Sequence, residues 1–198
     1  MKNKILTTLA VVGLAVAAQA TPVTFTFQEN GSEVNLGATS TFTSGGVSIT
    51  AYADPGGSLW AKLRSGESGL GLTSDVSGQD EITPGHFIQL GLPTTPITSL
   101  QLLFLESVTG GETALIYYST VLGTLGTLVG TVNNSGGSFD VSAYTAGYIG
   151  ISSGTGGGKN VLVESLTADL RTPDGASTML LMGGALTVLG LVRRKLTA

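Results

Sequence analysis

The chain has 198 residues, no cysteine, 30 glycines and 11% charged residues, whereas an average soluble domain has about 25% charged residues. The lack of cysteine excludes disulfide scaffolds, Cys-ligated zinc fingers and thiol catalysis, and the composition excludes a coiled coil. Nine basic against thirteen acidic side chains leave no basic surface for nucleic acid, and the length allows one domain of ordinary size.

The first twenty residues have the three parts of a secretory signal peptide. Lys2 and Lys4 supply a charged start, an apolar run follows over residues 5–18, and the segment ends on Ala18-Gln19-Ala20. Signal peptidase accepts this ending because its pocket admits only small side chains. We expect cleavage after Ala20. A transmembrane helix is the weaker interpretation, because the apolar run is short.

Residues 21–171 are predicted to form an exported, acidic, all-β domain. They contain four basic and twelve acidic side chains, a formal net charge of −8. Apolar and polar residues alternate with a period of two, and clusters of Gly, Pro, Asn and Ser separate the segments. This pattern predicts a two-sheet β-sandwich with jelly-roll or Greek-key connections. The predicted strands are 23–27, 47–51, 86–92, 97–105, 113–119, 148–152 and 161–170.

One acidic run in this domain is a candidate calcium site. Asp75, Asp80 and Glu81 lie in the sequence GLTSDVSGQDEI, and Asp54 and Glu67 can join them only across the fold. Calcium takes six to eight oxygen ligands in flexible geometry. The run lacks the D-x-D-x-D-G spacing of a calcium loop, so a solvated turn is the favoured interpretation and no cofactor is expected.

The sequence does not select a catalytic centre. His86 is the single histidine, no G-x-S-x-G motif is present, and we interpret His86 as a loop-edge residue without catalytic duty. A glycosidase would need two carboxylates facing one cleft. The sequence favours no pair among its candidates, which are Glu67, Glu81, Glu106 and Glu112.

A carbohydrate contact is the other candidate site. Trp60 is the single tryptophan, and together with Tyr52 or Tyr117 it could offer flat apolar faces to a sugar ring. The favoured interpretation is that Trp60 serves packing, because one large aromatic side chain in a small domain normally does.

The C-terminal 27 residues, 172–198, have a different design. Thr172-Pro173-Asp174-Gly175 precedes seventeen uncharged residues, 176–192, and the basic cluster Arg193-Arg194-Lys195 follows. Seventeen residues reach the short limit of a membrane-spanning helix. The basic cluster favours the cytoplasmic side, so the domain before it is expected outside.

This order of short motif, apolar helix and basic cluster resembles the PEP-CTERM class of bacterial sorting signals, in the variant whose motif reads Val-Pro-Asp-Ser/Gly-Gly. Thr172 and Ala176 depart from that variant. The resemblance implies that the chain is a substrate of exosortase, a membrane-embedded transpeptidase, and that the tail carries recognition, membrane insertion and stop. Members of the class accompany exopolysaccharide production in biofilm-forming Gram-negative bacteria, which implies a place in the envelope or matrix.

The middle of the chain, residues 65–170, also resembles exported members of this class, in Gly69-Leu70-Gly71-Leu72, Phe87–Leu92, Leu122–Leu128 and Tyr148–Ile151. Gly91 stands where the class usually has Asp. We therefore expect a non-catalytic structural or adhesive protein of the cell surface or exopolysaccharide matrix, initially anchored in the inner membrane. Its processing partners would be signal peptidase and exosortase. The alternatives are a carbohydrate-binding module, with or without calcium, and an envelope glycoside hydrolase.

Overall fold

The computed structural model describes residues 21–28, 33–64, 66–73, 80–93, 97–106, 112–133, 137–144, 146–154, 160–170 and 183–184. The chain divides into two compact units, and every strand belongs to the unit Ala20–Arg171. Of the other unit only Gly183 and Gly184 are described, and both are helical. The predicted signal peptide, the sorting motif and the basic cluster lie outside the described residues. Where the structure is described, it contains no helix of the length and apolarity that a membrane crossing requires.

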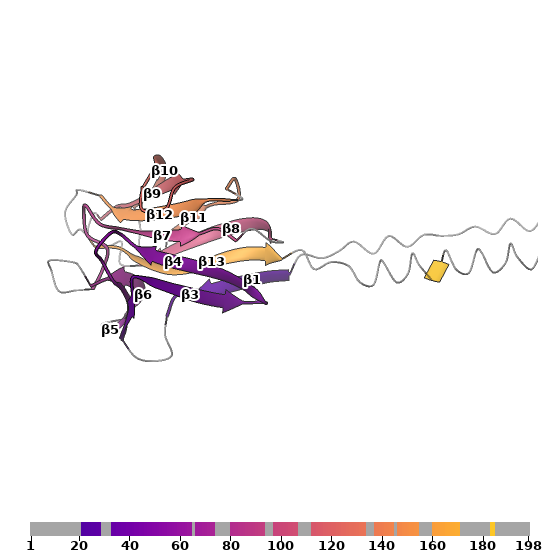
Figure 1. Cartoon of the computed structure of the whole chain (residues 1–198), viewed down its shortest axis with the longest axis horizontal. Coiled ribbons are helices and arrows are strands. Elements are labelled where there is room, and N and C mark those ends of the chain that lie inside the picture. The colour runs from indigo at the N-terminus through magenta and orange to yellow at the C-terminus, as the bar shows by residue number, and fades with distance from the viewer. Residues whose placement is uncertain are drawn as a thin grey trace, which may run out of the picture. The chain divides into compact units, whose positions relative to one another are not determined.

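The described part of the larger unit forms thirteen strands in two sheets, and every pairing is antiparallel (Figure 1). The seven-stranded sheet has the order β11 (Gly137–Asp140), β8 (Ile97–Glu106), β13 (Leu162–Leu170), β6 (Glu67–Leu72), β5 (Leu59–Arg64) and β2 (Val34–Gly37), with β1 (Thr21–Thr26) also on β13. The six-stranded sheet has the order β10 (Thr127–Val132), β9 (Ala114–Ser119), β12 (Tyr148–Ser153), β7 (Phe87–Gly91), β4 (Val47–Ala53) and β3 (Thr39–Ser44). The prediction of an all-β fold with two sheets is confirmed.

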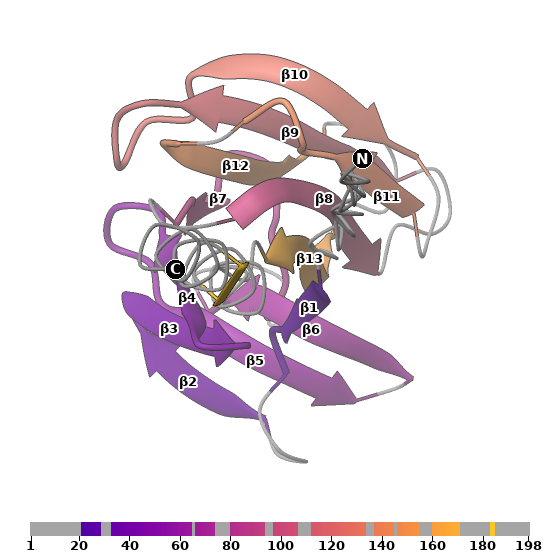
Figure 2. The same cartoon turned by 90° about the vertical axis from the view of Figure 1, so that its right-hand side faces the viewer.

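Strand β13 joins the parts of the seven-stranded sheet. It pairs with β8 along its length, with β1 from Thr21↔Leu170 to Thr26↔Ser165, and with β6 at Val163↔Leu70. Figure 2 shows β1 beside β13. The last strand of the domain therefore lies in the middle of its sheet and holds the first strand in place.

The core lies between the sheets and follows the alternation of the strands. Ile49 and Ala51 on β4 are fully buried in one apolar cluster with Leu70 and Leu72 on β6. Because successive side chains of a strand point to opposite faces, the polar residues of β4 point away from this cluster. Burying apolar surface contributes about 25 cal/mol per Å², so this core is the main source of stability in a domain without disulfides.

The Gly-Leu-Gly-Leu segment is strand β6, and its glycines allow a close approach. A Cβ atom at Gly71 would lie 2.0 Å from the carbonyl oxygen of Asp80, and one at Gly69 would lie 2.8 Å from the carbonyl oxygen of Val163. The leucines of the segment face the core. Gly71 thus lets residues 80–81 cross directly over the outer face of β6, and Gly69 allows the close approach of β13.

The predicted strands are all present with boundaries shifted by one or two residues, as β1, β4, β7, β8, β9, β12 and β13. Six further strands were not predicted. They have few apolar residues, as in the sequence TSTFTS of β3, carry charges, as in LWAKLR of β5, or contain glycine, as in β6, β10 and β11. Within 122–128, residues 122–126 form a loop and β10 begins only at Thr127.

Candidate functional site

A groove of about 610 Å³ lies on the outer face of the six-stranded sheet. Its volume falls within the range of about 300–1,000 Å³ that is usual for small-ligand sites. Of the β4 residues that line it, Ser48, Thr50 and Tyr52 alternate with the buried residues Ile49 and Ala51, so their side chains point away from the core. The lining residues are Gly46, Val47, Ser48, Thr50, Tyr52, Gly91, Leu92, Pro93, Thr120, Gly147 and Tyr148.

Two tyrosines lie over a glycine in this groove. Gly91 on β7 is the register partner of both Thr50 on β4 and Tyr148 on β12. The rings of Tyr52 and Tyr148 form an edge contact with centroids 6.0 Å apart and an interplanar angle of 77°. A Cβ atom at Gly91 would lie 3.3 Å from the Tyr52 ring and 3.7 Å from the Tyr148 ring. The missing side chain therefore lets both rings pack closely over Gly91.

The loop that supplies Thr120 is fixed by Gln89, a side chain with only 1% exposure. The Gln89 amide donates from Nε2 to the carbonyl oxygen of Thr124 at 2.8 Å and accepts at Oε1 from the amide of Gly123 at 2.6 Å. Nε2 also donates to the carbonyl oxygen of Val121 at 3.3 Å. The β9–β10 loop is thereby held against the outer face of the sheet as one wall of the groove.

The groove offers hydroxyl groups and aromatic surface without charge. Among the residues that the structure describes, its lining contains the hydroxyl side chains of Ser48, Thr50 and Thr120, the two tyrosines, and no Asp, Glu, Lys, Arg or His. Directly after Thr120 in the chain, Val121 is 58% and Leu122 46% exposed. Such a surface suits a neutral ligand that has both hydroxyl groups and apolar faces.

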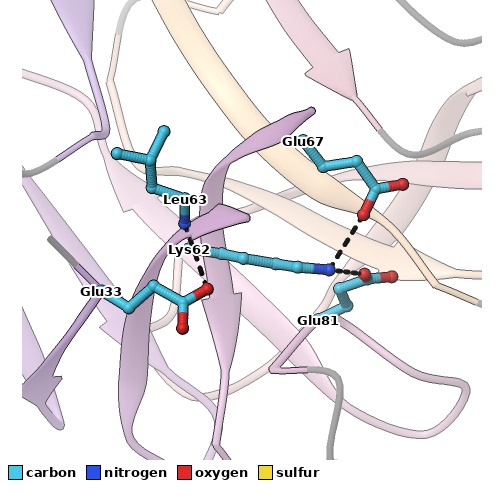
Figure 3. A network of polar contacts seen from close by, with 5 residues as sticks. All are labelled: Glu33, Lys62, Leu63, Glu67 and Glu81. Carbon is cyan, nitrogen blue, oxygen red and sulfur yellow. Dashed lines mark hydrogen bonds and ion pairs between the residues drawn. The ribbon is translucent and has the colours of Figure 1, made fainter. Parts of the chain in front are cut away.

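A second polar site, on the seven-stranded sheet, is a buried ion pair cluster (Figure 3). Lys62 on β5 donates from Nζ to Glu81 and, at 2.9 Å, to Glu67 on β6. The Lys62 and Glu81 side chains are 5% and 2% exposed, whereas Glu67 is 32% exposed. The amide of Leu63 donates to Glu33 at 3.4 Å beside this cluster.

Burial and charge shift the pKa values in this cluster. Burial alone would lower the pKa of Lys62, but its hydrogen bonds to Glu81 and Glu67 and their charges hold it above the ordinary value of 10.5. Burial raises the pKa of Glu81 above 4.5, against the opposing effect of Lys62 and with help from the charges of Glu67 and Glu112. Both shifts favour the protonated forms.

A third site pairs Asp54 with His86 at one end of the sandwich. His86 Nδ1 lies 2.6 Å from Asp54 Oδ2, and the His86 side chain is 34% exposed. The amide of Asp54 donates to the carbonyl oxygen of Phe87, and Ser152 Oγ donates to that of His86. The Asp54 Oδ1 atom is buried and has no hydrogen-bond partner in the described part of the chain.

The predicted site residues are divided among these places. Asp75 lies outside the described residues, Asp80 has a positive φ of 60° over β6, and Glu81 binds Lys62. Of the two residues considered across the fold, Glu67 joins Glu81 through Lys62, while Asp54 pairs with His86. Within the ranges that the structure describes, no three His, Cys, Asp or Glu side chains are placed to hold a metal ion.

Trp60 and Tyr52 are not brought together. Trp60 lies on β5 between the buried residues Leu59 and Ala61, so it points away from the core on the seven-stranded sheet. Tyr52 points away from the core on the other sheet. Tyr148 and Gln89 were not predicted as site residues. Each alternates with buried neighbours, so the sequence indicates that its side chain points outward, but it does not indicate which strand lies beside it.

Comparison with known proteins adds no assignment. No family model matches the sequence, and no match was found to a curated protein or to a solved structure.

Proposed function

We propose that the chain is an exported, non-catalytic adhesive protein of the cell surface or exopolysaccharide matrix, sorted through residues 172–198. The observation that carries this proposal is the groove on the six-stranded sheet, which presents hydroxyl and aromatic side chains to a ligand. No described side chain with a carboxylate, imidazole or ammonium lines it, so binding is better supported there than proton-transfer chemistry.

The remaining charged clusters also support a non-catalytic role. Glu67 and Glu81 bind one lysine rather than facing each other across the groove, and neither lines it. A glycosidase needs two carboxylates on either side of the scissile bond. Asp54 and His86 could orient one another, but they too lie outside the groove lining.

The strand order of the two sheets supports the jelly-roll topology, one of the two that the sequence predicts. One sheet contains the strand order β6-β13-β8-β11, and the other contains β7-β12-β9-β10. When the two orders are matched in sequence, the pairs are β6 with β7, β13 with β12, β8 with β9, and β11 with β10. Each position thus holds two strands that are consecutive in the chain, as expected for a long hairpin wound into two sheets. We assign the sandwich as a jelly roll extended by β2 to β5.

The order of the two ends in the sequence supports export and sorting, and localisation tests it. Cells expressing the full chain are compared with cells expressing a chain that lacks residues 172–198. We expect the full chain in the membrane and surface fractions and the shortened chain in the medium or periplasm. A full-length chain with Pro173→Ala and Asp174→Ala separates the motif from the helix, and is expected to reach the membrane without surface processing. Unchanged surface localisation after the deletion would contradict the proposal.

A further inference from the structure

We propose that the groove formed by Tyr52, Gly91 and Tyr148 binds a segment of neutral polysaccharide. This inference rests on the proposed adhesive function and names its ligand. It places the contact on the outer face of the six-stranded sheet. The two tyrosines are 96 positions apart in the sequence, and their strands β4 and β12 both pair with β7.

The two tyrosines provide the apolar part of the contact. A pyranose ring has a C–H face that packs on an aromatic ring, and its hydroxyl groups point outward around that face. The Tyr52 and Tyr148 rings meet at 77°, so they form an angled wall rather than one flat stack. Gly91 beneath them lets both rings lie close to the sheet, and both line the groove that a sugar ring would enter.

The hydroxyl groups around the tyrosines provide the polar part. Ser48 and Thr50 lie on β4 with Tyr52, and Thr120 directly follows β9, the strand next to β12. Thr50 Oγ1 and Ser48 Oγ each hydrogen-bond a hydroxyl on β3, Thr41 at 3.1 Å and Thr43 at 2.8 Å. Because a hydroxyl has one donor and two acceptor positions, each retains capacity for a bond to a sugar hydroxyl. Because the lining is uncharged and the exported domain carries −8, acidic polysaccharides are repelled over long range and gain no ion pair in the groove.

Hydrogen bonds within the protein hold one wall of the groove in place. Gln89 fixes the β9–β10 loop by three hydrogen bonds, and Ser119 Oγ bonds the amide and carbonyl of Val121 at 3.0 and 2.9 Å. A wall that is ordered beforehand reduces the entropy lost on binding. The exposed side chains of Val121 and Leu122 extend the apolar surface beside Thr120.

The test measures binding of the full chain, purified in a zwitterionic detergent without a sugar headgroup, to neutral glucans, galactans and mannans and to acidic polysaccharides. Tyr52→Ala and Tyr148→Ala are each expected to weaken binding of the neutral ligand by about tenfold or more, the loss of one packed aromatic face. Tyr117→Ala is the matched control, since Tyr117 lies on β9 of the same sheet but outside the groove lining, and it should leave the affinity unchanged.

Three results would overturn the inference. The first is that the wild type binds no neutral polysaccharide. The second is that the Tyr52→Ala and Tyr148→Ala variants, with unchanged unfolding midpoints, bind as tightly as the wild type. The third is that the wild type prefers acidic polysaccharides and that this binding falls steeply with salt. A neutral ligand should bind equally well at low and high ionic strength. The sorting experiment on residues 172–198 is independent of these measurements, so the failure of either proposal is recognised separately.

Discussion

The Nδ1 atom of His86 lies 2.6 Å from the Oδ2 atom of Asp54, although 32 positions separate the two residues in the sequence. The Asp54 side chain is 8% exposed, and its second oxygen has no hydrogen-bond partner where the structure is described. The imidazole is thus the side chain that satisfies a buried carboxylate. The solitary histidine of the sequence has a structural role at the end of β4.

His86→Ala should lower the free energy of unfolding by about 1–3 kcal/mol, because it leaves a buried acceptor without its partner. Urea denaturation at neutral pH measures this loss. Asp54→Asn combined with His86→Ala should cost less than the sum of the two single changes, since both remove one interaction. Strictly additive losses would show that the two side chains do not stabilise each other.

Lys62→Met should be among the most destabilising single changes, costing about 3–5 kcal/mol, because it leaves the buried Glu81 carboxylate without its cation. Glu67→Gln is the matched control, since Glu67 is a third exposed and should cost about 1 kcal/mol or less. Denaturant unfolding of the two variants gives both values. A Glu67→Gln variant that loses as much as Lys62→Met would contradict the burial argument.

The pH dependence of stability should include an alkaline loss that comes from Lys62. Its pKa is raised in the folded state, so the stabilisation is complete below 10.5 and is lost as the pH rises through the higher folded value. The free energy of unfolding of the wild type should fall in that range. The Lys62→Met variant, compared over the same pH values, should lack this part of the decline, and a parallel decline would rule out Lys62 as its source.

Gly71→Ala should destabilise the domain by about 1–3 kcal/mol or more, because the added Cβ would lie 2.0 Å from the Asp80 carbonyl oxygen. Gly91→Ala is the matched control in the other sheet, since its added Cβ meets the Tyr52 ring at 3.3 Å and that ring can shift. Thermal unfolding compares the two. Equal losses would mean that residues 80–81 move away from β6 at little cost.

Gln89→Ala should release the β9–β10 loop. Three hydrogen bonds from one buried side chain are lost, at a cost of about 1–3 kcal/mol. Hydrogen exchange of the Gly123 amide, which donates to Gln89 Oε1, should become faster while the amides of β7 and β12 stay protected. Unchanged exchange at Gly123 would show that the loop is held by other contacts.

The sequence was sufficient to predict the strands in which apolar and polar residues alternate clearly. Val47, Ile49 and Ala51 predict β4 because Ser48 and Thr50 lie between them. β6 was not predicted as a strand, because its glycines have no intrinsic preference for an extended conformation and are needed for the approach of Asp80. That approach comes from a distant part of the chain and leaves no local signal.

The candidate site was predictable only in part. The outward direction of Tyr52 follows from its buried neighbours, and its proposed role in carbohydrate contact survives as part of our inference. Its partner could not be chosen from sequence, because β4 and β12 are both neighbours of β7 and only that strand order places Tyr148 beside it. Trp60 was the more conspicuous aromatic residue, but its strand belongs to the other sheet.

The central position of β13 determines when the domain can fold. A chain emerges from the ribosome with its N-terminus first, so β1, β6 and β8 are all made before the strand that joins them. The seven-stranded sheet cannot be completed until Leu170 has emerged, when nearly the whole domain has been synthesised. Until then the nascent chain lacks the strand with which β1, β6 and β8 all pair.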